Sequence, residues 1–230
     1  MKTTRRAVIV LLALAAMGMW STPASAGPWS QPSGSADDFT YASGGDLSGY
    51  FGEPLVAGNT FYFINSNFQV NAVNDGTDTV SDIVSVDVTT NPGWQFTGIQ
   101  VFAFGTYSVV GDGSQVILDA GLTIHELGGQ QRTWSGPLAS TPPFPLTFGG
   151  IYPNSGDWNG DSNIDVLSIF PGPDSQLHLS LSNLLSAIAG PNGAAEINSQ
   201  YEQLAITLLP EPASLALLAV GAVLLVRRRR

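Results

Sequence analysis

Oxygen-bearing side chains recur at every second position between residues 157 and 165, where the chain reads DWNGDSNID. The alternate residues are Asp157, Asn159, Asp161, Asn163 and Asp165. Calcium takes about six to eight oxygen ligands from carboxylates and carbonyls. A loop that curls here would direct the four side chains of Asp157, Asn159, Asp161 and Asp165 inward, while Asn163 supplies its main-chain carbonyl. The pattern therefore predicts a structural calcium site that pins the loop.

This segment resembles the first nine positions of an EF-hand or dockerin-like calcium loop. Two positions depart from that pattern. Ser162 stands where such loops have the glycine of the sharp turn, and Ser168 stands where they have a bidentate acid. Dockerins also carry two loops, and this sequence has one. The alternative interpretation is an Asx-rich turn that leads into a strand at residues 166–170.

Tryptophans form the second set of candidate ligand-binding residues. Trp134 and Trp158 lie within a segment rich in glycine and proline, residues 128–160, which is expected to form a long loop. Aromatic rings in or beside turns can stack on sugar rings, so this pair predicts a glycan-binding surface. The alternative is that each tryptophan caps the hydrophobic core.

The sequence offers little for catalysis. It has no cysteine and no Gly-x-Ser-x-Gly motif, and no histidine follows His125 at the zincin spacing. Acid pairs such as Asp37 with Asp38, or Asp119 with Glu126, could serve a glycosidase, which needs two carboxylates. In so acidic a chain such pairs arise by chance. We therefore predict that the protein is not an enzyme.

The elements that must position these residues are predicted to be β-strands. Apolar and polar residues alternate at 79–90 and again at 177–182, which indicates strands with one buried face. Gly-Asp-Gly at 111–113 predicts a hairpin turn. The expected fold is all-β, an antiparallel β-sandwich resembling a jelly roll, over residues 47–209. Leu181, Leu184, Leu185 and Ile188 have helical spacing and predict a short helix. Residues 27–46 are expected to be a flexible leader.

The N-terminus has the composition of a secretory signal peptide. Lys2, Arg5 and Arg6 precede an apolar stretch at 7–20, and a small-residue cleavage site follows at 24–26. Residues 1–26 are therefore expected to be removed by signal peptidase, and the remainder to be exported.

The C-terminal segment, residues 210–230, has three parts. Pro210, Glu211 and Pro212 come first, then an apolar stretch at 213–226, and the last residues are Arg227, Arg228, Arg229 and Arg230. As a helix the apolar stretch would be hydrophobic on every face, and it predicts a short transmembrane helix with the arginines on the cytoplasmic side. The alternative is a terminal helix packed on the protein's own core.

This order of tripeptide, apolar helix and arginine cluster resembles the PEP-CTERM sorting signal. The resemblance is limited to this tail. It implies an exosortase-like enzyme that cuts near the tripeptide, delivery to the cell surface or extracellular matrix, and an exopolysaccharide or biofilm context. The expected function is therefore structural or adhesive; the alternative is a carbohydrate-binding module with a calcium-pinned loop.

Charge distinguishes the central segment from both ends. Between residues 27 and 209, Arg132 is the only lysine or arginine against 17 acids, which gives a formal charge of −16. Such a surface repels nucleic acid and attracts cations, so no nucleic-acid partner is expected. Without cysteines, stability must come from the core.

Overall fold

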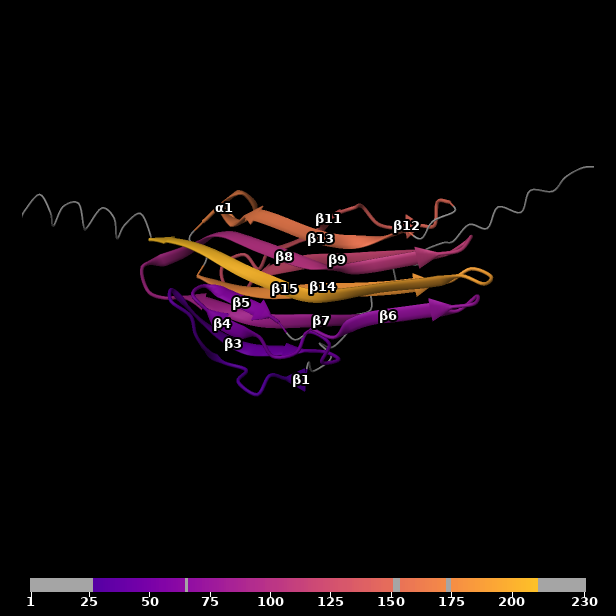
Figure 1. Ribbon diagram of the computed structural model, residues 1–230. Coiled ribbons are helices and arrows are strands. Elements are labelled where there is room, and N and C mark those ends of the chain that lie inside the picture. The colour runs from indigo at the N-terminus through magenta and orange to yellow at the C-terminus, as the bar shows by residue number, and fades with distance from the viewer. Residues whose placement is uncertain (1–26, 65, 151–153, 173–174, 211–230) are drawn as a thin grey trace, which may run out of the picture.

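The computed structural model describes residues 27–210, except for residue 65 and residues 151–153 and 173–174. Two antiparallel β-sheets stack on each other, so the prediction of an all-β sandwich is confirmed (Figure 1). The predicted signal peptide, and the sorting tail beyond Pro210, lie outside the described residues. Within the described ranges, no helix has the length and apolar character needed to cross a bilayer.

The first sheet, here called sheet A, has eight strands, with β1, β3, β7, β14, β9 and β10 side by side in that order, β2 beside β3 and β12 beside β9. Its strands are β1 (Gly27–Pro28), β2 (Gly34–Ser35), β3 (Phe39–Asp46), β7 (Thr77–Thr90), β9 (Gln115–Glu126), β10 (Thr133–Pro137), β12 (Leu146–Thr147) and β14 (Gln176–Ile188).

The second sheet, sheet B, has seven strands, in the order β11, β13, β8, β15, β5 and β4, with β6 also beside β15. Its strands are β4 (Leu55–Ala57), β5 (Thr60–Phe63), β6 (Phe68–Val73), β8 (Trp94–Val110), β11 (Ala139–Thr141), β13 (Asn154–Asp165) and β15 (Ala194–Pro210). The helix of the described residues, α1 (Val166–Ile169), follows β13.

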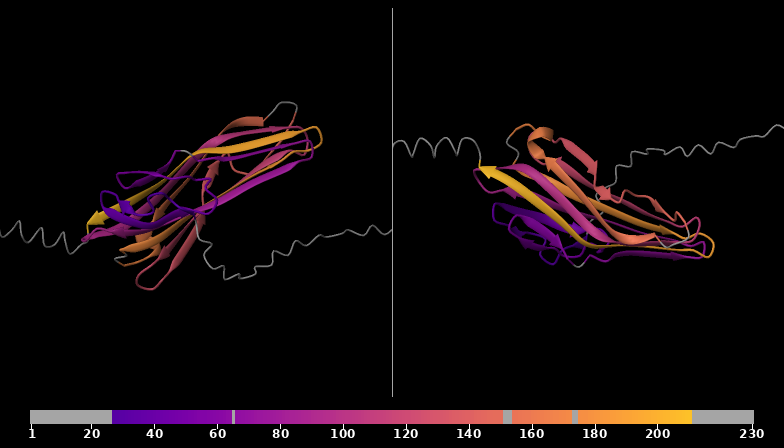
Figure 2. Two further views of the ribbon diagram at one scale, coloured as in Figure 1. Left: turned by 90° about the horizontal axis from the view of Figure 1, so that it is seen from below. Right: turned by 45° about the horizontal axis from the view of Figure 1, so that its top comes forward.

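The long strands alternate between the two sheets along the chain: β7, β9 and β14 belong to sheet A, and β8, β13 and β15 to sheet B. Each connection therefore crosses from one sheet to the other. At one end of the sandwich the turns are joined, because the Asp75 amide donates to the Gly190 carbonyl and the Asn74 amide to the Gly193 carbonyl (Figure 2).

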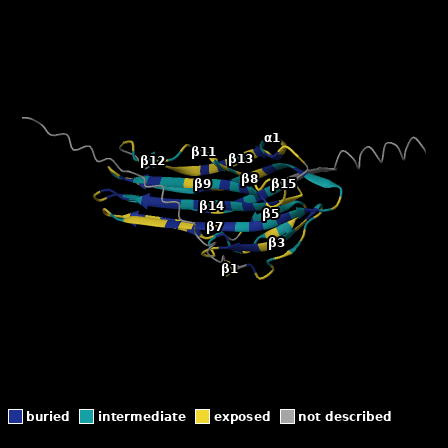
Figure 3. Ribbon diagram, turned by 180° about the vertical axis from the view of Figure 1, so that it is seen from behind, coloured by how far each residue is buried: buried dark blue, intermediate teal, exposed yellow. Residues whose placement is uncertain are grey.

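Alternation along the strands builds the core, as the sequence predicted. Val84, Val86 and Val88 on β7, and Leu177 and Leu179 on β14, are buried, while the residues between them are at least partly exposed (Figure 3). Period-two burial of this kind is the signature of strands with one face in the core.

Residues 27–46 are not a flexible leader, because they form β1, β2 and β3. Trp29 and Phe39 are buried, and both rings contact Phe61 of sheet B. The composition of this segment is polar, but two large aromatic rings are enough to fix it onto the sandwich, since each buries a large apolar area.

Two other local predictions are wrong. Residues 181–188 are part of strand β14 and not a helix, because pairing with β7 and β9 on both sides fixes them in an extended conformation. The helix lies instead at α1, where a strand was expected, and the Asp165 side chain caps it by accepting from the amides of Leu167 and Ser168.

Residues 128–160 are also not one long loop. They contain β10, β11, β12 and the start of β13. β10 and β11 lie at the edges of sheets A and B, and β12 is a two-residue strand beside β9. Edge strands tolerate proline and glycine better than central strands do, so this composition is compatible with strands at these positions.

Polar side chains form a layer inside the sandwich. Asp82 on β7 lies directly opposite Asn183 on β14, and both are buried. From sheet B, Glu202 accepts hydrogen bonds from Asn183 (2.6 Å) and from the Ser199 hydroxyl (2.9 Å). Burial raises the pKa of Glu202 to about 7, and the nearby Asp82 carboxylate adds to that rise.

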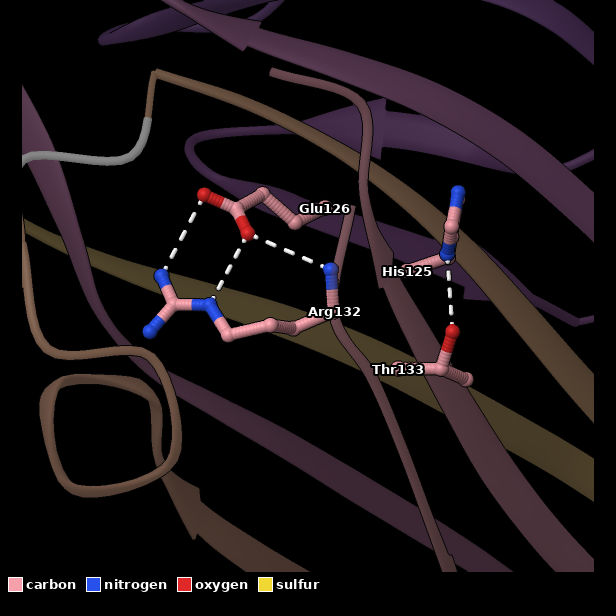
Figure 4. A network of polar contacts seen from close by, with 4 residues as sticks. All are labelled: His125, Glu126, Arg132 and Thr133. Atoms are coloured by element: carbon pink, nitrogen blue, oxygen red, sulfur yellow. Dashed lines mark hydrogen bonds and ion pairs between the residues drawn. The ribbon is translucent and has the colours of Figure 1, made fainter. Parts of the chain in front are cut away.

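The single cation of the described chain is already paired. The Arg132 guanidinium donates to both oxygens of the buried Glu126, from Nε at 3.0 Å and from Nη2 at 3.2 Å (Figure 4). Arg132 also lies over the ring of Phe170, with 5.3 Å between its Cζ and the ring centroid. No other lysine or arginine of the described residues can balance the acids of the surface.

Candidate functional site

The five predicted calcium ligands lie in a row on β13. This strand pairs with β8 along its whole length, so the segment is extended and not a curled loop. Asp157, Asn159, Asp161, Asn163 and Asp165 are exposed on the outer face of sheet B. Alternate residues of a strand are about 6–7 Å apart, so one ion cannot contact the whole row.

The loop geometry expected for calcium is therefore wrong, although calcium binding by the row itself stays a prediction. Asp165 is used as the cap of α1. Within the described ranges, no group of three or more His, Cys, Asp or Glu side chains is arranged to hold a metal ion.

Trp158 cannot stack on a sugar, because it is 2% exposed and faces the core. Its indole N–H donates to the Asn198 carbonyl at 2.8 Å, and its ring meets Phe144 edge to face. Trp134 on β10 is half-buried and packs against the same core. For Trp158 the core-capping alternative is correct, since an extended β13 places residue 158 on the inner face of sheet B.

The outer face of sheet B carries a different aromatic group, which the sequence analysis missed. Phe102 and Phe104 on β8 and Tyr201 on β15 form what we call the aromatic platform. The rings of Phe104 and Tyr201 are stacked, with centroids 5.3 Å apart and planes inclined by 26°. Phe102 lies 6.2 Å from Phe104 and 6.4 Å from Tyr201. Phe104 is 39% exposed, which is unusual for a phenylalanine at the centre of a sheet.

A β-bulge turns Tyr201 outward. The pairing of β15 with β8 shifts between Ser199 and Tyr201, where Gln200 is the extra residue. Ser199 and Glu202 both face the core although they are three residues apart. Without the bulge, Gln200 would occupy the outward position after Ser199, and strict alternation would direct Tyr201 inward with Ser199. The bulge therefore supplies both the outward-facing, half-buried Tyr201 ring and the buried Glu202 carboxyl.

Polar side chains border the aromatic platform on the β13 side. Asn159 lies directly opposite Phe104, and Asp161 lies directly opposite Phe102. Neither side chain makes a hydrogen bond to another described residue, so both are available to a ligand. Two residues of the predicted calcium row, Asn159 and Asp161, thus lie beside the aromatic rings.

Polar side chains also border the platform on the β15 side. Gln203 lies opposite Phe102 and next to Tyr62 of β5, and it accepts a hydrogen bond from the Tyr201 hydroxyl at 3.0 Å. Partial burial raises the pKa of Tyr201, and the neighbouring Tyr62 adds to the shift. The phenol therefore stays protonated at neutral pH and can donate a hydrogen bond.

The electrostatics of this face limit the kind of ligand it can bind. Asp157 and Asp161 carry negative charge on it, and Arg132, the only lysine or arginine of the described chain, is bound to Glu126. Flat aromatic rings with amide and carboxylate neighbours match a ligand with hydroxyl groups and an apolar face. An anionic ligand would be repelled.

Comparison with known proteins adds resemblances of low similarity. No protein-family model matches the chain, and no curated protein matches it. Among solved structures, one similar protein is the carbohydrate-binding module TmCBM61 in complex with beta-1,4-galactotriose, at 12% identity and a TM-score of 0.21, covering 66% of this chain and 83% of that one.

Two further structures are similar at the same level. One is from infectious bursal disease virus, Gx strain, at 13% identity and a TM-score of 0.25, covering 68% of this chain and 43% of that one. The other is the enzymatically active domain of bacteriophage CBA120 tailspike protein 4, at 9% identity and a TM-score of 0.19, covering 65% and 19%. Scores of this size support no argument about function.

Proposed function

We propose that this protein binds a neutral polysaccharide through the aromatic platform of sheet B, as a component of the cell surface or extracellular matrix. The observation that carries the proposal is the stack of the exposed Phe104 on the half-buried Tyr201, bordered by Asn159 and Asp161, whose side chains make no hydrogen bond to another described residue.

The rings supply the apolar part of such a contact. Pyranose rings have an apolar face of C–H groups, and this face packs on flat aromatic surfaces, whose negative π face attracts the C–H groups. Exposed aromatic groups that gather on one face of a soluble domain commonly mark a binding surface. The platform spans two adjacent strands, so it can contact more than one sugar unit of an extended chain.

The polar side chains beside the aromatic platform supply the hydrogen bonds of such a contact. Sugar hydroxyls both donate and accept hydrogen bonds. Asn159 offers a donor and an acceptor, Asp161 offers acceptors, and Gln203 has a free amide N–H group alongside its bonded oxygen. Because the face has no cation, we expect selection for neutral glycans over uronate-rich or sulfated ones.

Affinity electrophoresis and isothermal titration calorimetry would test the proposal. Soluble glucans, galactans and mannans serve as neutral probes, and alginate serves as the anionic probe. The wild-type protein is expected to bind at least one neutral glycan and not alginate. Phe104→Ala and Tyr201→Ala should each weaken binding about tenfold, which corresponds to about 1.4 kcal/mol.

Ile83→Ala is the matched control, since Ile83 is 43% exposed on the outer face of sheet A, away from the platform. Its affinity should equal that of the wild type. Failure of the wild type to bind any neutral glycan would refute the proposal, and so would equal losses in Ile83→Ala and Phe104→Ala.

Export and C-terminal processing belong to the same proposal. The supporting features are the signal-peptide composition of residues 1–26 and the Pro210-Glu211-Pro212 tripeptide followed by an apolar stretch and four arginines. Pro210 is the last residue of β15, so a cut beyond it by an exosortase-like enzyme would leave sheet B complete. The intact mass of the extracellular product tests this: a C-terminus near Pro210 is expected, and one at Arg230 would contradict processing.

A further inference from the structure

Both histidines of the chain lie next to each other on the outer face of sheet A. His178 on β14 is directly opposite His125 on β9. The same row continues to Asp87 on β7, which is opposite His178, and to Thr133 on β10, which is opposite His125. Four neighbouring strands thus align Asp87, His178, His125 and Thr133 on the face of the sandwich opposite to the aromatic platform.

Each imidazole makes a hydrogen bond to the strand on the side away from the other histidine. Nδ1 of His178 lies 2.6 Å from Oδ1 of Asp87, and Nδ1 of His125 lies 2.8 Å from the Thr133 hydroxyl. In the neutral tautomer whose Nδ1 donates to Asp87, Nε2 of His178 has a free lone pair. Figure 4 shows the second ring nitrogen of His125 pointing away from Thr133. Because the two Nδ1 atoms are tied to opposite flanks, both Nε2 atoms are free to bind one ligand from above the β14–β9 pair.

We propose that His125 and His178 form a two-nitrogen site for a divalent transition-metal ion such as Cu²⁺ or Zn²⁺, with Asp87 orienting the His178 ring. Directly opposite residues of antiparallel strands have Cβ atoms about 4.5–5.5 Å apart, which allows two imidazoles to share one ion at about 2.0–2.1 Å from each nitrogen. The ion can reach them from solvent, since the His178 side chain is 36% exposed and that of Asp87 is 31% exposed.

The chemistry of the row selects the metal. Imidazole nitrogen suits copper, nickel and zinc, and Cu²⁺ binds most tightly of these. Calcium prefers oxygen ligands and gains little from two imidazoles. Since no group of three or more His, Cys, Asp or Glu side chains in the described ranges is arranged around an ion, water must complete the coordination. We therefore expect binding of moderate strength, tighter for Cu²⁺ than for Zn²⁺.

Calorimetric titration of the full chain with Cu²⁺, and electron paramagnetic resonance of the complex, test the site. One equivalent of Cu²⁺ should bind with two nitrogen ligands visible in the spectrum. His125→Ala and His178→Ala should each weaken binding at least tenfold and remove one nitrogen. Asp87→Asn keeps both nitrogens, so it should weaken binding less than either histidine variant.

Asp119→Asn is the matched control, because Asp119 lies on the same face of β9, three alternate positions from His125. It removes one negative charge and leaves the row intact, so binding should be unchanged. Binding that survives both histidine substitutions would overturn the proposal. Equal weakening by Asp119→Asn and the histidine variants would also overturn it, since the ion would then be held by general surface charge. Circular dichroism of each variant confirms that it is folded.

Discussion

Asn183 of β14 donates a 2.6 Å hydrogen bond to Glu202 of β15 and so joins the two sheets through the core. Both residues are buried. The Glu202 carboxyl also accepts a hydrogen bond from the Ser199 hydroxyl at 2.9 Å. Both hydrogen bonds lower the pKa of Glu202, but burial raises it by more, and the pKa is about 7. The centre of the sandwich therefore contains a group that titrates near neutral pH.

The titration of Glu202 makes stability depend on pH. Below pH 4.5, the ordinary value, the carboxyl is protonated in both the folded and unfolded states, so there is no effect. Between about pH 4.5 and 7 only the folded state keeps the proton, and the free energy of unfolding falls as pH rises. Above pH 7 the loss is complete, at about 3 kcal/mol.

Glu202→Gln removes this dependence, because glutamine keeps an acceptor oxygen and carries no charge. Urea denaturation should show that the stability of Glu202→Gln relative to the wild type is about 2.5 kcal/mol greater at pH 8 than at pH 5. Glu196→Gln, on the outer face of the same strand, controls for the loss of one negative charge. A constant difference between Glu202→Gln and the wild type at both pH values would contradict the assignment.

Removing Arg132 should cost more than removing a surface ion pair. Glu126 is 2% exposed and depends on Arg132 for a bidentate partner. Arg132→Ala leaves the carboxylate buried without that partner and should lower the free energy of unfolding by about 3–5 kcal/mol. The double variant Glu126→Gln/Arg132→Met should lose less than Arg132→Ala alone in the same denaturation experiment. A larger loss in the double variant would refute this explanation.

Replacing Gly105 by a residue with a side chain should destabilise the fold, because Gly105 pairs with Ser199, where the bulge of β15 begins. A Cβ atom at this position would overlap the Asn198 carbonyl oxygen and lie 2.7 Å from Nε1 of Trp158, and these two atoms already form a hydrogen bond with each other. Gly105→Ala should therefore lower stability by about 3 kcal/mol. It should also weaken glycan binding, since Tyr201 is positioned by the same bulge.

Gly128→Ala provides the comparison for this prediction. A Cβ atom on Gly128 would have no heavy atom within 4 Å, so stability should change by less than about 0.5 kcal/mol. Thermal unfolding of the two variants side by side measures the difference. Equal melting temperatures would show that β8 and β15 can separate at the bulge without cost.

Calcium binding to β13 should be weak. The extended strand keeps Asp157 and Asp161 far apart, so an ion there would have few protein ligands and a dissociation constant in the millimolar range at best. Calorimetry at millimolar calcium, with Asp157→Asn/Asp161→Asn as the control, measures it. Micromolar binding that the double variant abolishes would show that β13 rearranges around the ion.

The sequence predicts the strands well where a long period-two pattern is buried on one face. Residues 84–88 and 177–181 are of this kind, and their alternation leaves one choice of inner face. The same rule fails at residues 181–188, where leucine lies on both faces of β14 and imitates helical spacing. Pairing on both sides of that strand decides the conformation, and pairing is not visible in a local pattern.

The aromatic platform could not be predicted for a related reason. Phe102 and Phe104 belong to an apolar run that also contains the buried Val101 and Ala103, so nothing local shows which residues face outward. Tyr201 is directed outward by the single extra residue Gln200, which has no signal of its own. The histidine row likewise depends on the register of three strand pairs.

The position of β15 has a mechanical consequence. This strand lies inside sheet B, bonded to β8 on one side and to β5 and β6 on the other, and its last residue, Pro210, still pairs with Trp94. Tension applied to the chain beyond Pro210 would load these hydrogen bonds in shear, all together, instead of peeling them apart one at a time. A glycan held at the aromatic platform would pull on Phe102 and Phe104 of β8 as well as on Tyr201 of β15, so part of the load between the ligand and Pro210 would pass through the hydrogen bonds that join these two strands.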